Sequence, residues 1–264
     1  FQSFLNPLTE KDIVAPWEAK IVTINEDGIF PRDRGYPSYV AAPGMSALGR
    51  AMAVDLNIHQ GVEIEQILGE SGNWSLVDKD GGSYTDFDWV AVCVPSPQSS
   101  KLLPRNFNAL SQVQAASLLP AFTLMLGFKD DLDLSFDGAF IEESPVGFVS
   151  VNNTKPCRSQ ETSIVVQSNN KWAKHNVDRD KNEVAEILLK EFERLVPTKV
   201  SIPDHKVIHR WLYANVNQSV GSSYLLDSEN QLAACGDWCI AGRVEAAFES
   251  GRSLAENLNQ LVAT

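Results

Sequence analysis

The spacing of apolar side chains changes abruptly near residue 60, from a helical pattern to an extended one. Between 44 and 57 apolar residues recur every three or four positions, which predicts an amphipathic helix; they are Met45, Leu48, Met52 and Leu56. Three apolar runs follow, at 62–68, 74–77 and 87–94, with turn-forming residues between them. These runs predict a three-stranded meander. Because 89–94 is continuously apolar, we expect its strand to be buried on both faces.

The middle of the chain, from about 100 to 224, alternates short apolar runs with polar loops. Strands are predicted at 121–128, 138–142, 147–152, 163–168 and 207–213. A helix is predicted from about 178 to 196, because its apolar residues share one face and Pro197 follows it. This region is therefore expected to form an antiparallel sheet covered by a helix.

The last part of the sequence combines a strand near 231–235, a turn of small residues from Gly236, and a helix from about Val244. The apolar side of this helix is expected to comprise Val244, Ala247, Phe248, Gly251, Leu254, Leu258 and Leu261. Asp237 then lies at the carboxyl end of a strand, where open α/β sheets bind ligands, and the amides near 242–246 begin a helix. This stretch is a candidate cofactor contact. The alternative is a plain connection in which Asp237 only caps the helix.

The order of elements predicts two domains, one inserted into the other. The first is discontinuous and comprises 40–99 and 225–264, while the second comprises 1–39 and 100–224. The expected fold class is α/β with α+β character.

Charge and composition narrow the function classes. The chain has 34 acidic and 22 basic residues, for a net charge of −12, which argues against a nucleic-acid partner. No apolar stretch approaches the roughly 20 residues that span a bilayer, and no signal peptide is evident, so we expect no membrane partner and a cytoplasmic location. Four cysteines in 264 residues are too few for a disulfide scaffold and are expected to be buried thiols; they are Cys93, Cys157, Cys235 and Cys239.

Several common chemistries lack their motifs. His205 and His209 are four residues apart, but they lie in a predicted strand rather than a helix, so a metal site is not expected. Cys235 and Cys239 have no second pair to complete a zinc site. The chain contains no Gly-x-Ser-x-Gly elbow, no Gly-x-Gly-x-x-Gly loop and no Walker loop.

The stretches 235–238 (Cys-Gly-Asp-Trp) and 242–251 (Gly-Arg-Val-Glu-Ala-Ala-Phe-Glu-Ser-Gly) closely resemble the C-terminal FAD motif of flavin-dependent amine oxidases, in particular the bacterial renalase-like branch. Further stretches agree with this family in the same order along the chain: 39–48, 92–98, 119–122 and 209–214. The resemblance implies an FAD-binding Rossmann-like domain with a β-meander, and an inserted antiparallel-sheet substrate domain.

The resemblance also implies roles for individual residues. Asp237 would hold the ribitol or pyrophosphate region of FAD beside Gly236, and the backbone from Gly242 through Arg243, Val244 and Glu245 would meet the pyrimidine edge of the flavin. The helix dipole there would favour the anionic reduced flavin. Val62 would meet the adenine by its backbone, and Val94 and Pro95 would line the same nucleotide end.

The family begins with a βαβ unit that carries the glycine fingerprint, and this sequence does not contain it. Phe1, Phe4, Leu5 and Leu8 already share a helical face, so we expect the sequence to be a fragment. The missing segment or a homo-oligomer is then an expected partner, and exposed apolar surface or poor stability is expected where a strand is missing.

Trp211 and Tyr213 are the candidate substrate-pocket residues. Alternation along a strand places them on one face with His209, where aromatic rings could wall a flat ring stacked on the flavin; the alternative is that they are core residues. The branch resembled oxidises dihydronicotinamides reduced at the wrong ring position, giving NAD(P)⁺ and, from molecular oxygen, hydrogen peroxide. An amine or polyamine oxidase is one alternative, and a non-catalytic binding module that has lost FAD is another.

Overall fold

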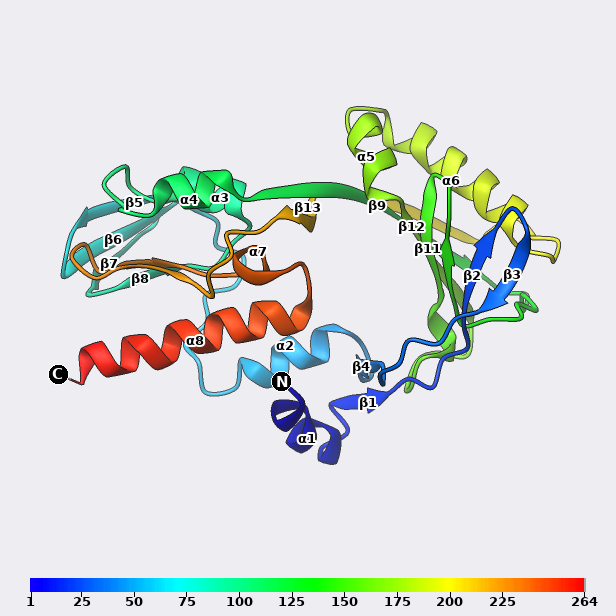
Figure 1. Cartoon of the computed structure of the whole chain (residues 1–264), viewed down its shortest axis with the longest axis horizontal. Coiled ribbons are helices and arrows are strands. Elements are labelled where there is room, and N and C mark those ends of the chain that lie inside the picture. The colour runs from blue at the N-terminus through cyan, green and yellow to red at the C-terminus, as the bar shows by residue number, and fades with distance from the viewer. Residues whose placement is uncertain (264) are drawn as a thin grey trace. The chain divides into compact units, whose positions relative to one another are not determined.

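The computed structural model describes residues 1–263, which form two compact units (Figure 1). Of the described residues, unit 1 comprises Phe1, Asn57–Leu118 and 215–263; unit 2 comprises Gln2–Leu56 and Leu119–Ala214. Compared with the expected boundaries, 40–56 lie in unit 2, whereas 100–118 and 215–224 lie in unit 1. Two of the boundaries fall inside long strands, where neither composition nor hydrophobic period changes and the sequence carries no signal.

Unit 1 is built on a three-stranded sheet of order β14 (Leu225–Asp227), β15 (Leu232–Ala234) and β8 (Val90–Val92). β15 pairs with β8 in parallel and with β14 in antiparallel fashion. The accompanying helices are α3 (Ser96–Leu102), α4 (Leu110–Ala115), α7 (Asp237–Ile240) and α8 (Val244–Val262). One face of the sheet packs in a core that includes Val113, Leu232 and Trp238, and the other packs against Leu254 of α8.

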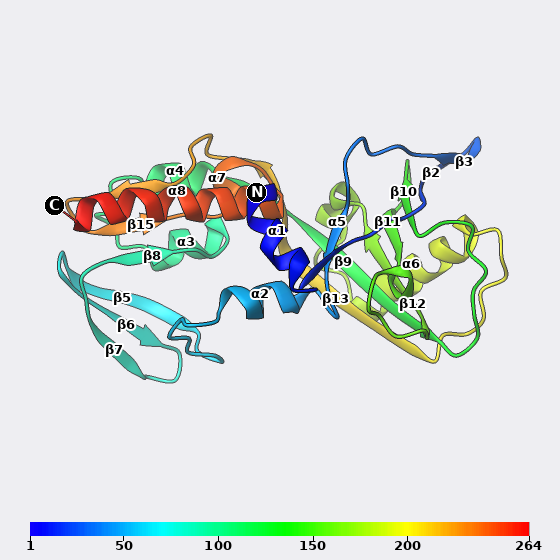
Figure 2. The same cartoon turned by 90° about the horizontal axis from the view of Figure 1, so that it is seen from below.

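The meander of unit 1 differs from the predicted one in its third strand. It consists of β5 (Ile64–Glu70), β6 (Asn73–Asp78) and β7 (Ser83–Phe87), and Figure 2 shows these strands as a sheet separate from β8. The predicted run 87–94 instead supplies β8. The polar β7 is largely exposed, whereas Val90 and Val92 of β8 are buried. The more hydrophobic of the two segments, β8, therefore belongs to the parallel sheet.

The expectation that the 89–94 strand is buried on both faces is wrong, because Ala91 is exposed. β8 is the edge strand of its sheet among the described residues, and α8 packs over the neighbouring strands, where Ala233 and Leu226 contact its Leu254 and Leu258 cluster. A side chain on the same face of β8 therefore lies outside that cover.

Helix α8 begins at Val244 as predicted, but only Leu254 of the predicted apolar side is buried, so the expected buried face is wrong for the other residues. The buried residues are Ala246, Ser250 and Leu254, spaced four apart, while Val244 is 63% exposed and Leu261 is 41% exposed. A helix of 19 residues is about 28 Å long, whereas a three-residue strand covers only about 10 Å. The short sheet therefore buries residues only within 246–254, in the N-terminal part of the helix.

Unit 2 contains a seven-stranded sheet of order β13-β9-β12-β11-β10-β2-β3. Its strands are β2 (Ile21–Asn25), β3 (Gly28–Pro31), β9 (Ser117–Phe128), β10 (Gly138–Ile141), β11 (Val146–Val151), β12 (Thr162–Ser168) and β13 (His205–Gln218). The five predicted strands are confirmed, and β2 and β3 were not predicted. The sheet is not purely antiparallel, because β2 pairs with β10 in parallel.

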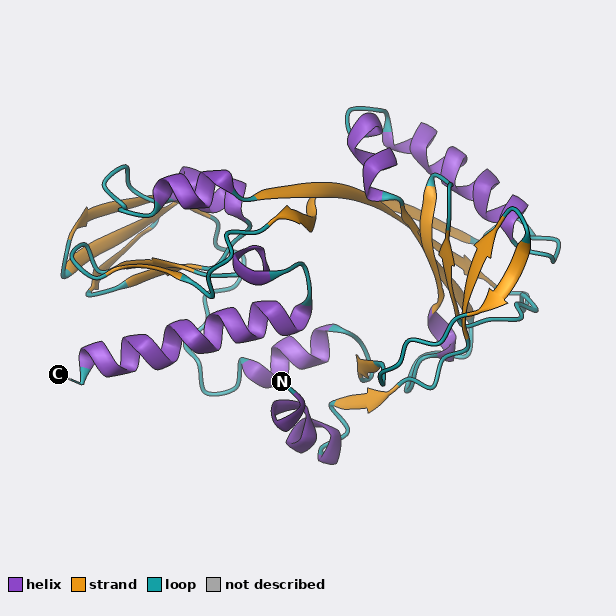
Figure 3. Cartoon of the chain, viewed as in Figure 1, coloured by secondary structure: helices purple, strands orange, loops and turns teal. Residues whose placement is uncertain are grey.

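The helices α5 (Asn170–Asn176) and α6 (Lys181–Leu195) cover one face of this sheet (Figure 3). The predicted helix 178–196 is confirmed as α6, which Asp180 caps by accepting the amide N–H groups of Asn182 and Glu183 at 2.8 and 3.2 Å. Val184, Leu188 and Phe192 of α6 are fully buried against the sheet.

The remaining elements of unit 2 are α1 (Gln2–Glu10), β1 (Val14–Pro16), β4 (Tyr39–Ala41), α2 (Ser46–Met52) and the short 3-10 helix η1 (Asn152–Thr154). α2 confirms the helix predicted within 44–57, yet none of its residues is buried. Met45, Met52 and Leu56 are exposed, so the described residues leave the apolar side of α2 uncovered.

Two further expectations concern burial and membranes. All four cysteines are free thiols, but only Cys235 and Cys239 are buried; Cys93 and Cys157 are exposed, so the expected burial is wrong for them. Among residues 1–263, no helix combines the length and the hydropathy needed to cross a bilayer.

We predict that Leu188→Ala lowers the free energy of unfolding by about 2–5 kcal/mol, because it leaves a cavity between α6 and the sheet. Urea denaturation followed by tryptophan fluorescence measures this change. The control is Glu193→Ala at an exposed position of the same helix, with an expected change within about 0.5 kcal/mol. Equal changes in the two variants would contradict the packing of α6 described above.

Candidate functional site

The turn after β15 requires glycine at its first position. Gly236 has φ 158°, and a Cβ atom built on it would lie 2.6 Å from Nε1 of Trp238. Any other residue would therefore displace the indole. The chain can pass this close to Trp238 only where it carries no side chain.

Trp238 joins two segments that are distant in sequence and were both predicted to belong to the site. It is fully buried, and its indole N–H donates to the carbonyl oxygen of Val94 at 3.0 Å. The same oxygen accepts from the Ser99 hydroxyl at 2.7 Å. Val94 and Pro95, which precede α3, are thus brought together with Gly236 and Asp237.

Ser250 holds the other side of the turn and was missed as a site residue. Its hydroxyl accepts the amide N–H of Gly236 at 3.0 Å and donates to the carbonyl of Ser223 at 2.6 Å, with no exposed surface. A signal was present, because a serine between Ala246 and Leu254 interrupts an apolar stripe of four-residue spacing. A buried hydroxyl there needs a hydrogen-bond partner across the helix interface.

Asp237 is half-buried at the first position of α7. Burial raises the pKa of its carboxyl, and the backbone amides of Trp238 and Asp237 partly oppose that rise. No side chain among the described residues donates a hydrogen bond to this carboxylate. It therefore retains acceptor capacity for a hydroxyl group of a ligand.

The start of α8 has no side-chain cap. Arg243, the N-cap residue, is extended with φ −148° and ψ 154°, and it makes no capping hydrogen bond. Gly242 approaches the backbone of β13 closely, since a Cβ built on it would lie 3.0 Å from the Val216 nitrogen. The exposed first turn at Val244 and Glu245 leaves backbone N–H groups that can bind an anionic group.

Val62 lies half-buried two residues before β5 and takes no part in the hydrogen bonds that join Val94 to the Gly236 turn. β5 packs against α3, whose N-cap is Pro95. The structure thus brings the strand that follows Val62 next to the helix that follows Pro95.

Trp211 and Tyr213 belong to unit 2, on β13 next to β9. Trp211 is 52% exposed, its ring lies 4.1 Å from that of His209, and its indole N–H donates to the Thr123 hydroxyl at 3.2 Å. The core alternative is therefore wrong for Trp211, while Tyr213 is half-buried. Phe122, next to Thr123 but on the opposite face of β9, is a true core residue under α5.

The face of the sheet opposite α5 and α6 carries a continuous row of side chains across five strands. The pairings align Thr23 with Phe140, Phe140 with Phe148, Phe148 with Gln167, and Gln167 with Thr123. We call this set, together with Trp211, the open-face row. The rings of Phe140 and Phe148 are 4.8 Å apart.

Two arginines add positive charge to one end of this row. The guanidinium of Arg32 lies 4.4 Å from the centre of the Phe140 ring and donates to the Thr23 hydroxyl at 3.2 Å. The guanidinium of Arg34 lies 5.9 Å from the same ring. Such an arrangement suits a flat ligand with an anionic group.

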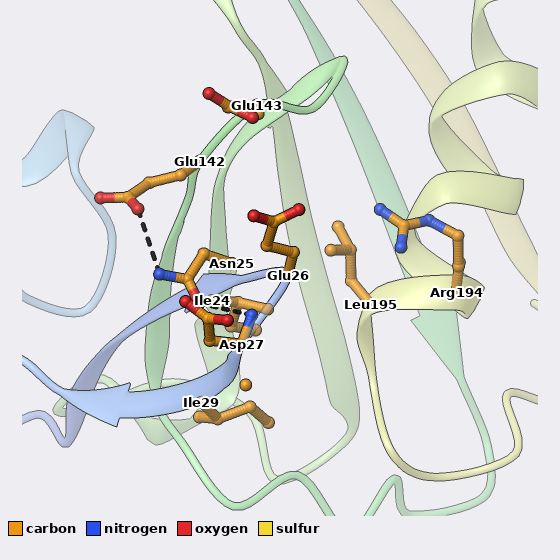
Figure 4. Close-up of a pocket in the computed structure, with 10 residues that line it drawn as sticks. Ile24, Asn25, Glu26, Asp27, Ile29, Glu142, Glu143, Arg194 and Leu195 are labelled. Atoms are coloured by element: carbon orange, nitrogen blue, oxygen red, sulfur yellow. Dashed lines mark hydrogen bonds between the residues drawn. The ribbon is translucent and has the colours of Figure 1, made fainter.

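A pocket of about 690 Å³ lies at the other face of the same sheet, beside the turn between β2 and β3. Figure 4 shows Glu142 and Glu143 on one side of it, Arg194 and Leu195 on the other, and Glu26 between them. Its three glutamates are exposed, and Ile24 and Leu195 connect it to the core under α6. None of the residues predicted for the site lines this pocket, and its carboxylates form a solvated acidic surface.

The chain matches the model of a family described as flavin containing amine oxidoreductase over residues 26–259. A renalase from Mus musculus is 24% identical over 170 residues, which are 60% of this chain and 48% of that protein. An oxidoreductase from Methanosarcina mazei has a similar structure with a TM-score of 0.59 at 15% identity, covering 83% of this chain and 55% of that one. For a putrescine oxidase bound to putrescine the TM-score is 0.56 at 14% identity, covering 89% and 56%. The chain thus spans about half the length of these proteins.

We predict that Ser250→Ala lowers the free energy of unfolding by about 1–3 kcal/mol, because the Gly236 amide and the Ser223 carbonyl lose their shared buried partner. Chemical denaturation measures the change, and Ser253→Ala, at a half-buried position of the same helix, is the matched control. If Ser250→Ala is no less stable than this control, Ser250 does not hold the turn.

Proposed function

The chain belongs to the flavin containing amine oxidoreductase family, whose cofactor is FAD, and on that premise we propose that it oxidises dihydronicotinamides reduced at the wrong ring position. Overall, this reaction would convert the dihydronicotinamide, one proton and molecular oxygen into NAD(P)⁺ and hydrogen peroxide. Family membership confirms the resemblance and the expected cofactor; the substrate is the proposed part.

The residues around the Gly236 turn fit FAD. The uncapped first turn of α8 offers backbone N–H groups to an anionic ring edge or phosphate, and the half-buried carboxylate of Asp237 can accept from a ribityl hydroxyl. Gly242 lets the segment before α8 lie close to the backbone of β13. We propose unit 1 as the cofactor-binding unit, with Val62, Val94 and Pro95 at the nucleotide end.

When bound, FAD supplies the hydride acceptor. The backbone N–H groups at Val244 and Glu245 would stabilise the negative charge that collects on the flavin ring, because they lie at the positive end of the α8 dipole. Trp238 and Ser250 act indirectly, since they hold the turn that positions Asp237.

The open-face row is the observation that favours a dihydronicotinamide over an amine. Aromatic rings on this face, Trp211 above all, can stack a flat nicotinamide ring. Arg32 and Arg34 can pair with the pyrophosphate of a dinucleotide, whereas the same charges would repel an ammonium group. The carboxylates that would attract a polyamine lie on the opposite face, around the acidic pocket.

Two alternatives remain distinguishable from this proposal. An amine or polyamine oxidase would release peroxide with amines and not with dihydronicotinamides. A binding module that has lost FAD would purify colourless and would not take up added FAD.

We predict that Asp237→Ala weakens FAD binding about tenfold, because it removes a charge-assisted hydrogen bond worth roughly 1.5 kcal/mol. Titration of the apoprotein with FAD, followed by the change in flavin fluorescence, measures the dissociation constant. Glu249→Ala removes an exposed acid from α8 and should leave this constant unchanged. Unchanged affinity in Asp237→Ala would remove Asp237 from the cofactor site.

We predict that Trp211→Ala raises the KM for a misreduced dihydronicotinamide about three- to tenfold, because stacking is lost, while the FAD content stays constant. Arg32→Ala should raise the KM for the dinucleotide more than for the mononucleotide, which lacks the pyrophosphate bridge. Peroxide release under steady-state conditions measures both. Equal KM values for variant and parent proteins would place the substrate elsewhere, and turnover of amines alone would contradict the proposed substrate class.

A further inference from the structure

Cys93 and Cys235 lie side by side at the carboxyl ends of two parallel strands. Their sulfur atoms are 3.3 Å apart. Ala234 pairs with Val92, and the amide of Cys235 continues the ladder by donating to the Val92 carbonyl at 3.2 Å. Neighbouring strands are about 4.8 Å apart, which is within the range of Cα separations that a disulfide can bridge.

The two thiols share a face but differ in accessibility. Side chains alternate along a strand, so Cys235 lies on the same face as Ala233, where Leu254 of α8 covers it. Cys235 is 5% exposed. Cys93 follows the edge strand β8, on the side of exposed Ala91, and is itself an exposed residue. A small oxidant can therefore reach Cys93, whereas Cys235 is buried next to it.

The contact also shifts the pKa values of the two thiols in opposite directions. The contact with Cys235 lowers the pKa of Cys93 to about 7, and the same contact, together with burial, raises the pKa of Cys235. The third thiol nearby, Cys239 on α7, has its pKa raised to about 11 by burial. Cys93 is thus the nucleophile of the group, since the thiolate is the reactive form of cysteine.

We propose that Cys93 and Cys235 are a modification site for hydroperoxides, in which Cys93 is oxidised first and Cys235 then closes a disulfide with it. The Cys93 sulfur attacks one peroxide oxygen; the O–O bond breaks, an S–O bond forms, and the other oxygen leaves as water with the thiol proton. Cys235 then attacks this sulfenic sulfur, so the S–S bond forms, the S–O bond breaks, and a second water leaves. Two thiols and one hydrogen peroxide give one disulfide and two waters.

The second step is helped by the first. The contact with Cys93 is the largest cause of the raised pKa of Cys235, and conversion of the Cys93 thiolate into an uncharged sulfenic acid weakens that effect while the two sulfurs stay adjacent. The disulfide would link the residue before Val94 to the residue before Gly236, which are the segments that Trp238 already joins. This inference does not depend on the identity of the substrate, because the peroxide can be supplied from outside.

The test treats the chain with hydrogen peroxide and follows its intact mass. We expect the loss of two hydrogen atoms and no gain of oxygen. Digestion with trypsin and a protease that cleaves before aspartate then separates Cys235 from Cys239 at Asp237, so a peptide linked to Cys93 identifies its partner. Cys157, an exposed thiol in unit 2, is the internal control. A link that contains Cys157 or Cys239, or oxidation of Cys157 while Cys93 stays reduced, would overturn the proposal.

Two variants separate the steps. In Cys235→Ser the reaction should stop at a sulfenic acid on Cys93, which dimedone traps, and in Cys93→Ser the disulfide should be lost completely. In the parent chain the oxidation rate should fall about tenfold from about pH 8 to about pH 6, because Cys93 becomes protonated; the titratable groups that interact with it are Cys235 and Cys239. Dimedone labelling of Cys235 in Cys93→Ser, or a pH-independent rate, would contradict the assigned order. The parent digest decides the pairing even if a variant fails to fold.

Discussion

The hydrogen bond from the Trp238 indole to the Val94 carbonyl is the interaction on which the candidate cofactor site depends. It joins the segments that leave two parallel strands, although 144 positions separate the bonded residues. This position of the indole restricts residue 236 to glycine, because any side chain there would collide with the Trp238 ring. Ser250 completes the arrangement from α8, so the start of that helix, the turn and the end of β8 are held by buried hydrogen bonds rather than by apolar packing alone. Such buried bonds fix a backbone in one geometry, because leaving either partner unpaired is unfavourable.

In unit 2 the same strands serve two purposes. Alternation places Phe122 and Leu124 in the core under α5 and α6, and Thr123 on the opposite face with Trp211. The helices cover only one face, and the other presents aromatic rings with guanidinium groups near them. A chain with a net charge of −12 has few places where cations gather, so the position of Arg32 and Arg34 on this face favours an anionic ligand there. Acidic side chains gather instead at the pocket on the helix side.

The parallel pairing of β8 and β15 has a chemical consequence beyond the cofactor. It aligns Cys93 with Cys235, and because α8 covers only one of the two strands, it exposes one sulfur and buries the other. The thiol pair and the candidate cofactor contacts thus share a single structural origin, the ends of these two strands. A disulfide here would restrain the same backbone that Trp238 and Ser250 hold, so redox state and the geometry of the turn are coupled by covalent connection.

Local patterns in the sequence predicted much of this protein. Hydrophobic period predicted the helical face of α6 and the alternation of β9 and β13. Residue types that favour particular conformations predicted the glycine-aspartate turn and the start of α8 at Val244. The C-terminal motif identified the family. The tertiary structure decided which part of α8 is buried, that 90–92 leaves the meander, that Trp211 is exposed, and that Ser250 and Cys93 have partners more than 25 positions away. The hydrophobic period is a local property of one strand or helix. The hydrogen-bond or contact partner of a side chain depends instead on how elements distant in sequence pack together, and residue spacing does not encode that packing.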